Sequence, residues 1–188
     1  RYIAGIKEAT TANETIGADI FGNILHQVLH TLYEPHVGVP ITVQALETML
    51  NALDKTLLSA FKAEFKEGEL NYGKNVLTYS IARKYLKSFL AQEKKRAVAG
   101  EVITVEHLEE TFSSEISEEF TLKGTCDRID RKGSKINVID YKTGNVNPNK
   151  LSFIDNDDIT ENKKTNILQL ASYITIVNSK IGLKRFCF

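Results

Sequence analysis

Residues 123–144 constrain the fold more than any other part of the chain. Apolar and β-branched residues flank the dipeptide Gly133-Ser134, and a two-residue loop that begins with glycine is typical of a type II′ turn between antiparallel strands. The register set by that turn places Asp127 directly opposite Asp140, with their Cβ atoms about 4.5–5.5 Å apart. The segment therefore predicts a β-hairpin that carries two facing carboxylates.

A lysine joins the two acids on the predicted hairpin. Lys142 follows Asp140 by two residues, so the alternation of side chains along a strand puts it on the same face. Ile129, Ile136 and Val138 share that face and are expected to be buried. Facing carboxylates repel each other unless one is protonated or a cation lies between them, and oxygen ligands favour Mg²⁺ or Mn²⁺. A surface cluster of ion pairs is the alternative explanation.

Periodicity divides the rest of the chain into a helical half and a β-rich half. Helical spacing of apolar residues predicts three helices, and alternation predicts a β-meander after them. The expected helices span residues 13–34, with Asn13 as cap and Pro35 as stop, 42–65, and from about 73 to 98, closed by Gly100. The expected strands include 102–105, 111–113 and the two of the hairpin, followed by a polar loop at 145–164, a helix at 165–179 and a last strand at 183–188.

Three stretches in order resemble one family of nucleases. The sequence from Gly124 to Asp130, followed by Val138-Ile139-Asp140-Tyr141-Lys142-Thr143-Gly144, resembles the metal-binding hairpin of the PD-(D/E)XK nucleases. The RecB-like and AddB-like branch is the most similar. The first helix carries Gly22-Asn23-Ile24-Leu25-His26, which is similar to the glycine and histidine of that branch. Gln169 and Tyr173 on the later helix resemble its Gln-x-x-x-Tyr motif.

The resemblance implies a fold and a role for each of these residues. It implies a restriction-endonuclease-like α/β core, a mixed β-sheet flanked by helices, here with an N-terminal helical portion. It also implies that His26 and the backbone carbonyl of Tyr141 join Asp127 and Asp140 as metal ligands. By the same resemblance, Gln169 and Tyr173 position the catalytic lysine or the DNA strand, and a helicase or a helicase-like protein is fused to the domain or associated with it.

His26 also has readings that do not involve this family. His26 and His30 lie four residues apart on the first helix, as in zinc proteases, but the residues between them lack the glutamate that would act as a base. The zinc-protease interpretation is therefore disfavoured. From the sequence alone, the favoured interpretation of His26 is a histidine packed in the core or at its boundary, and the family resemblance reverses that preference. His30 is expected to be structural, and Glu110, which resembles a glutamate of the relatives, is expected to be an exposed strand residue.

Length and composition set the remaining bounds. At 188 residues, with 42% hydrophobic and 26% charged residues, the chain is expected to form a single domain, with residues 1–100 helical and 101–188 holding the sheet and active site. Because Arg1 is not an initiator residue, we expect an excised piece of a larger protein. No apolar run is long enough to span a membrane, and the two cysteines indicate reduced thiols in the cytoplasm. They are too few for the iron–sulfur cluster of some relatives.

The charge pattern leaves room for a nucleic-acid partner. The formal net charge is zero, which by itself argues against phosphate binding. Residues 101–119 contain seven acids and no lysine or arginine, whereas residues 83–96 and 123–150 are each net basic. A basic face is therefore compatible with a neutral total, although these runs could also be ordinary solvated faces.

The sequence thus predicts a Mg²⁺- or Mn²⁺-dependent deoxyribonuclease. A divalent ion held by the acids would polarise a phosphate and activate a water, and Lys142 would stabilise the charge that develops on the phosphorus group. The resemblance favours an exonuclease that acts on DNA ends or single strands in recombination or repair. Two alternatives remain: a catalytically inactive DNA-binding or protein-interaction module with a nuclease fold, and a metal-stabilised interaction domain.

Overall fold

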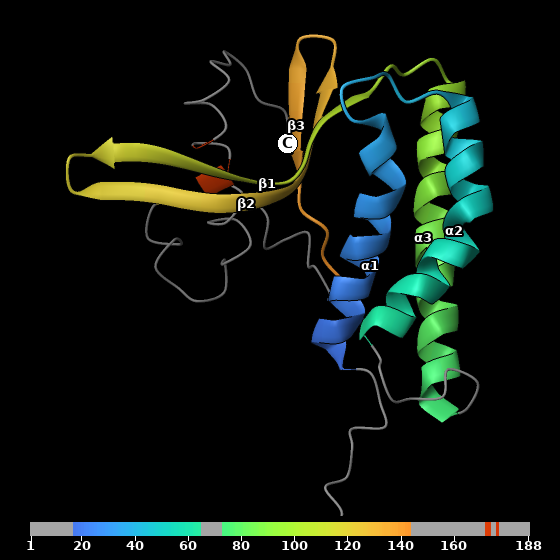
Figure 1. Ribbon diagram of the computed structural model, residues 1–188. Coiled ribbons are helices and arrows are strands. Elements are labelled where there is room, and N and C mark those ends of the chain that lie inside the picture. Colours follow the sequence, from blue (N-terminus) through green and yellow to red (C-terminus); the bar gives the residue numbers. More distant parts are fainter. Residues whose placement is uncertain (1–16, 65–72, 144–171, 174–175, 177–188) are drawn as a thin grey trace, which may run out of the picture.

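The computed structural model describes residues 17–64, 73–143, 172–173 and 176. Three helices precede a three-stranded antiparallel sheet, which confirms the predicted α/β class with an N-terminal helical portion (Figure 1). The elements are α1 (Ala18–Tyr33), the 3₁₀ turn η1 (Glu34–His36), α2 (Val43–Glu64), α3 (Gly73–Val98), β1 (Thr104–Ser117), β2 (Phe120–Lys132) and β3 (Lys135–Ile139). The predicted loop at 145–164, the last strand and Cys187 lie outside the described residues, as does most of the predicted helix at 165–179.

The three helices pack side by side around one apolar core (Figure 1). Each contributes side chains that are almost completely buried, because their apolar residues recur every three or four positions. These include Ile24, Val28, Tyr33, Leu46, Leu57, Phe61 and Leu90. The helical core therefore forms the fixed layer on which the sheet is placed.

The ends of the helices match the sequence with one exception. α1 begins at Ala18 instead of near residue 13, because Gly17 has an extended backbone, with φ −69° and ψ 163°, and acts as its N-cap. α1 stops before Pro35, as predicted. α3 ends at Val98, also as predicted, and Gly100 follows with φ +87° while its N–H donates to the carbonyl of Ala97. Glycine adopts that left-handed conformation without steric cost.

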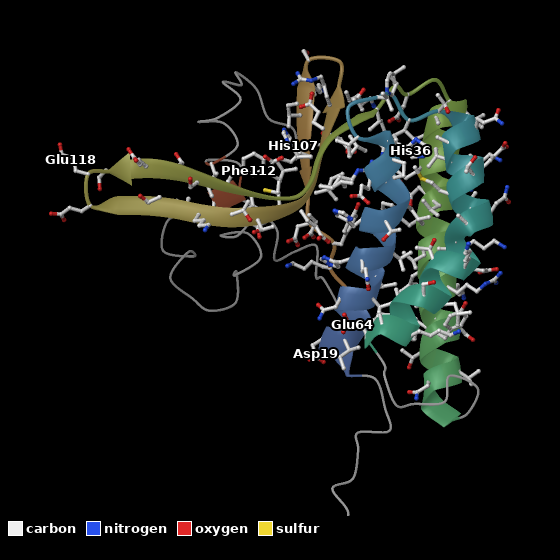
Figure 2. All side chains as sticks on the ribbon, in the orientation of Figure 1. Asp19, His36, Glu64, His107, Phe112 and Glu118 are labelled. Atoms are coloured by element: carbon white, nitrogen blue, oxygen red, sulfur yellow. The ribbon has the colours of Figure 1, made fainter. Side chains whose placement is uncertain are left out.

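β1 is one long strand where two short ones were predicted. It pairs with β2 along nearly its whole length, and the register shifts by one residue between Val105 and His107. Such a β-bulge bends a pair of strands, and Figure 1 shows β1 and β2 turning away from the helices as a long hairpin. Glu118 lies at the far tip of that hairpin (Figure 2). The bulge thus brings the base of the hairpin against the helices while its tip extends outward.

The predicted register of the second hairpin is confirmed. Lys132 pairs with Lys135, and the pairing continues without a shift to Arg128 and Ile139. Gly133 has φ +60°, as the first position of a type II′ turn requires. β3 ends at Ile139, however, so the segment from Asp140 to Thr143 lies beyond the strand. Strand alternation therefore does not determine where the Lys142 side chain points.

A second, smaller apolar cluster covers the middle of β2. Phe112, Cys126, Ile129 and Ile136 pack there with Tyr173 and Ile176, which come from the predicted C-terminal helix. A Cβ atom on Gly124 would lie only 2.7 Å from Cε1 of Tyr173. Because no real Cβ approaches a ring carbon so closely, the packing of Tyr173 requires glycine at this position.

Within the part of the chain that the structure describes, none of the helices has the length and apolar character needed to cross a membrane.

Candidate active site

The base of the β2–β3 hairpin meets the middle of α1 at three residues. His26 on α1 places its Nε2 2.9 Å from the backbone oxygen of Tyr141, and its Nδ1 lies 3.4 Å from Oδ1 of Asp127. The other carboxylate oxygen of Asp127 accepts a hydrogen bond of 2.6 Å from the Tyr141 N–H. The histidine, the first acid and the Tyr141 backbone, which the sequence suggested as metal ligands, therefore contact one another directly.

Helix α1 can approach the segment after β3 closely at this point. One turn before His26, a Cβ atom on Gly22 would lie 3.5 Å from the hydroxyl oxygen of Thr143. That is an ordinary van der Waals distance, so this contact alone does not require glycine. The Tyr141 ring packs edge-on against His26, with ring centroids 5.6 Å apart. These contacts fix the orientation of the imidazole relative to the Tyr141 peptide group.

The environment of His26 stabilises its protonated form. Its hydrogen bond with Asp127 raises the pKa of His26 above the ordinary value of 6.5, against the lowering effect of partial burial. The negative charges of Asp127 and Asp140 add to the rise. Both carboxylates of the predicted hairpin pair therefore favour a positive charge on the imidazole. A positive charge at this position is therefore favoured, and a metal cation would meet the same electrostatic field.

Asp140 and Lys142 form the second part of the site. Nζ of Lys142 lies 2.8 Å from Oδ2 of Asp140, in an ion pair whose carboxylate side chain is 8% exposed and whose lysine side chain is 36% exposed. The acid is thus nearly buried while the ammonium reaches the surface. Although β3 ends before these residues, the structure brings together the acid and the lysine that the sequence singled out.

The donor atoms at this site have the chemistry that a hard divalent cation requires. The backbone carbonyl and the two carboxylates suit Mg²⁺ or Mn²⁺, whereas the histidine nitrogen is a softer donor. His26 Nε2 is hydrogen-bonded to the Tyr141 oxygen at 2.9 Å, and the histidine would give up this hydrogen bond in order to bind a metal. Within the described residues, however, no three His, Cys, Asp or Glu side chains are already grouped to hold a metal. The donor set fits, while its carboxylates are engaged with His26, Lys142 and the Tyr141 N–H.

A buried ion cluster lies directly behind this site. Arg128, the residue after Asp127, is completely buried and donates two hydrogen bonds, of 2.6 and 2.7 Å, to Asp130. A third, of 2.9 Å, goes to Glu93 on α3, and the guanidinium lies 4.2 Å from the centre of the Tyr33 ring. Successive side chains of β2, Asp127 and Arg128, both contact the helical layer. The cluster therefore ties β2 to α1 and α3 beside the candidate site.

Two features were not predicted from the sequence: the buried cluster, and the position of Glu109 in the lining of a polar cavity. Glu110 is exposed and pairs with His107, as predicted for an ordinary strand acid. Its neighbour Glu109 adopts φ +47°, a left-handed conformation that is uncommon outside glycine. With His26, His30 and Glu64, Glu109 lines a polar cavity of about 380 Å³. Nothing in the local sequence signals this turn of the backbone.

The tyrosine of the Gln-x-x-x-Tyr motif lies on the sheet. Tyr173 is 8% exposed and packs in the apolar cluster around Cys126, with its ring against Gly124. Burial raises the pKa of the Cys126 thiol to about 12, and the charges of Asp127 and Asp140 add to the rise. Cys126 is a free thiol in the structure. Gln169 lies outside the described residues.

Comparison with known families decides what kind of protein this is. The profile of the PD-(D/E)XK nuclease superfamily matches residues 1–184, which is nearly the whole chain. The chain belongs to the PD-(D/E)XK nuclease superfamily. Comparisons with curated proteins and with solved structures give no significant match. The described helices and antiparallel sheet are consistent with the fold of this superfamily.

Membership gives the functional class. It indicates nuclease activity on a nucleic-acid substrate, by hydrolysis of phosphodiester bonds. Members of the superfamily typically use a divalent metal ion. The resemblance stated from the sequence is thus confirmed at the level of the superfamily.

Proposed function

We propose that this chain is a Mg²⁺- or Mn²⁺-dependent deoxyribonuclease of the RecB-like and AddB-like type, an exonuclease acting on DNA ends or single strands in recombination or repair. The observation that carries the proposal is the convergence of His26, Asp127 and the Tyr141 backbone beside the Asp140–Lys142 ion pair. Finer features of the proposal are a single domain of residues 1–188, a cytoplasmic location and a helicase-like protein that is fused or associated. The helicase-like protein rests on the sequence resemblance, the single domain on length and composition, and the cytoplasmic location on the cysteine content.

In this proposal, His26, Asp127, Asp140 and the Tyr141 carbonyl hold the metal ion. When bound there, the ion would act as a Lewis acid on the phosphate and lower the pKa of a water molecule. Asp127 also orients the site, because it holds the Tyr141 N–H and faces Nδ1 of His26. Because Nδ1 and Nε2 face opposite sides of the imidazole, Asp127 would exchange its contact with Nδ1 for the metal when it acts as a ligand together with Nε2.

Lys142 has a different task in the proposed reaction. Its ammonium is held 2.8 Å from Asp140 and reaches the surface, so it can approach a phosphate without leaving its partner. There it stabilises the negative charge that builds up on the phosphate oxygens in the transition state. Gln169 and Tyr173 are proposed to position the lysine or the DNA strand. The packing of Tyr173 on Gly124, three residues before Asp127 in β2, supports a place near the site.

Incubation with DNA tests the proposal most directly. Single-stranded and duplex DNA are each incubated with the protein in Mg²⁺, in Mn²⁺ and in chelator, with Asp140→Asn as the control for contaminating nuclease. We expect degradation only with metal and only by the wild type, progressing from ends. Binding of DNA without cleavage in any metal would favour the inactive DNA-binding module instead. Equal digestion by Asp140→Asn would point to a contaminating nuclease or to a wrong site.

A further inference from the structure

A groove between α1 and α3 opens beside the candidate active site. It has a volume of about 420 Å³ and is lined by Leu25 and Leu29 of α1, Tyr85 and Phe89 of α3, and Lys142 and Thr143. Cavities of 300–1,000 Å³ are typical of ligand sites. Because Lys142 belongs both to the groove and to the ion pair with Asp140, whatever fills the groove lies next to the reacting phosphate.

The walls of the groove are aromatic and apolar. Phe89 packs edge-on against Tyr141, with ring centroids 5.8 Å apart, so its ring is held in place from within the site. Tyr85 is 55% exposed and packs edge-on against Phe21, with ring centroids 6.5 Å apart. An aromatic ring that is both fixed and exposed offers a flat apolar face on which a planar ligand can stack.

The rim of the groove is polar and positively charged. Ser88 and Gln92 of α3 line it and are exposed. Lys84 stands one helical turn before Ser88, and Lys95 stands one turn after Gln92. Both lysines are exposed, and among the described residues neither takes part in an ion pair, whereas Arg83, Lys94 and Arg96 of the same helix are paired with acids. The basic stretch seen in the sequence thus borders the groove.

We infer that this groove takes unstacked nucleobases of the DNA strand whose phosphate lies at Asp140 and Lys142, with Tyr85 as the stacking platform. This inference rests on the proposed function. Aromatic rings that stack bases beside lysines that neutralise phosphates are the common means of binding single strands without sequence preference. Tyr85 is therefore a positioning residue, which holds the strand but does not touch the reacting atoms.

Binding of two fluorescent probes tests the inference without cleavage. The full chain is titrated in chelator, at fixed salt, with an oligothymidine and with an abasic oligonucleotide of the same length, and fluorescence anisotropy gives each Kd. We expect Tyr85→Ala to weaken oligothymidine binding about 5- to 150-fold, the range that corresponds to 1–3 kcal/mol per stacked base. Binding of the abasic probe should stay unchanged, and Tyr85→Phe should restore the oligothymidine affinity.

Two further variants separate base stacking from charge and from general damage. Lys84→Ala should weaken both probes by the same factor and reduce the salt dependence of binding, since it removes a phosphate contact. Leu58→Ala is the matched control, because Leu58 is also an exposed apolar residue, 40% accessible, but lies on α2 away from the groove. It should bind both probes like the wild type.

The outcomes distinguish this inference from the proposed function. If Tyr85→Ala binds oligothymidine like the wild type, or weakens both probes equally, the stacking role is wrong. A lowered melting temperature with unchanged affinities would also overturn it and would show that the groove serves internal packing. If the wild type binds oligothymidine more tightly than the abasic probe but fails to cleave DNA with metal, the proposed function is wrong and the base-stacking inference is kept. If the wild type cleaves DNA with metal but binds both probes equally, the proposed function is kept and the base-stacking inference is wrong.

Discussion

Two charged clusters start at adjacent residues of β2 and differ in their access to solvent. The buried cluster consists of Arg128, Asp130 and Glu93, and its arginine has no exposed surface. The open cluster consists of His26, Asp127, Asp140 and Lys142, whose histidine and lysine side chains are 29% and 36% exposed. Each cluster joins β2 to the helical layer, through Glu93 of α3 in the buried cluster and His26 of α1 in the open one.

The difference lies in what surrounds each charge. The side chain of Arg128 is held by two carboxylates and an aromatic ring, and these contacts, against the effect of burial, keep its pKa above the ordinary value. In the open cluster, the ammonium of Lys142 reaches the surface from its ion pair with Asp140. Charges that are enclosed can only support the fold, whereas charges that reach solvent can also act on a substrate. The comparison predicts that mutations in the buried cluster mainly lower stability, whereas mutations in the open cluster mainly lower activity.

The largest expected effect is on stability, from Arg128→Met. Removal of the guanidinium leaves Asp130 and Glu93 buried without their main cation, and breaking a buried pair in this way typically costs about 3–5 kcal/mol. Urea unfolding should therefore show a large loss of unfolding free energy. Arg83→Met is the control, because Arg83 makes a similar two-bond contact to Asp54 on the exposed surface, and it should change stability very little.

A combined variant sharpens this result. When Arg128→Met, Asp130→Leu and Glu93→Met are made together, no buried charge remains unpaired, and Arg96 keeps its contact with Glu101. Replacement of a whole buried ion cluster by apolar residues is often neutral, so the triple variant should recover much of the lost stability. If it is less stable than Arg128→Met alone, the hydrogen bonds of the cluster contribute more than this comparison assumes.

The second effect is on activity, from Lys142→Ala. Loss of a group that stabilises transition-state charge commonly lowers kcat by about 10²–10³-fold, while the Lys142–Asp140 pair, whose ammonium reaches the surface, should contribute less to stability than the enclosed Arg128 pair. We expect Lys142→Ala to lower the melting temperature less than Arg128→Met does and its cleavage rate at saturating metal to fall by that factor. A large drop in melting temperature with full specific activity would reverse the assignment of the two clusters.

The smallest effect concerns pH and the exposed Asp54–Arg83 pair. Hydrogen bonds from Arg83 lower the pKa of Asp54 below the ordinary 3.8. A carboxylate with a lowered pKa stabilises the folded state above its unfolded pKa, and this stability is lost as the pH falls through the folded pKa. The small difference in melting temperature between wild type and Arg83→Met should therefore be constant above about pH 5 and shrink below pH 3.8. A difference in melting temperature that grows as the pH falls would contradict this prediction.

Local patterns predicted the parts of the fold that depend on neighbouring residues. The turn at Gly133-Ser134 set the register of the hairpin, and apolar periodicity located the helices within a few residues. Where the prediction failed, the structure depends on contacts between distant residues or on the backbone conformation of a single residue. β1 continues through a bulge, β3 stops at Ile139, and α1 begins only after Gly17. None of these alters the hydrophobic pattern on which the prediction depends.

The candidate site was predictable in its residues and less so in its connections. The acids and Lys142 were singled out from the register and alternation of the predicted hairpin, and His26 from its resemblance to a family pattern. The buried cluster could not be found in this way, since an arginine within a strand indicates exposure until its partner is known. Glu93 lies 35 residues earlier on another element. Pairings over that distance leave no periodic signal in a single sequence.

Tyr141 shows that a peptide group can serve as a functional group. Its N–H is bound by Asp127 and its carbonyl by His26, while its aromatic ring packs against His26 and Phe89. Any amino acid other than proline would supply the same two backbone atoms. An alanine scan would therefore leave both atoms in place, and it would report only on the ring contacts with His26 and Phe89 and on the path of the chain. Chemical replacement of the peptide bond by an ester would remove the N–H alone, and so expose what the backbone contributes.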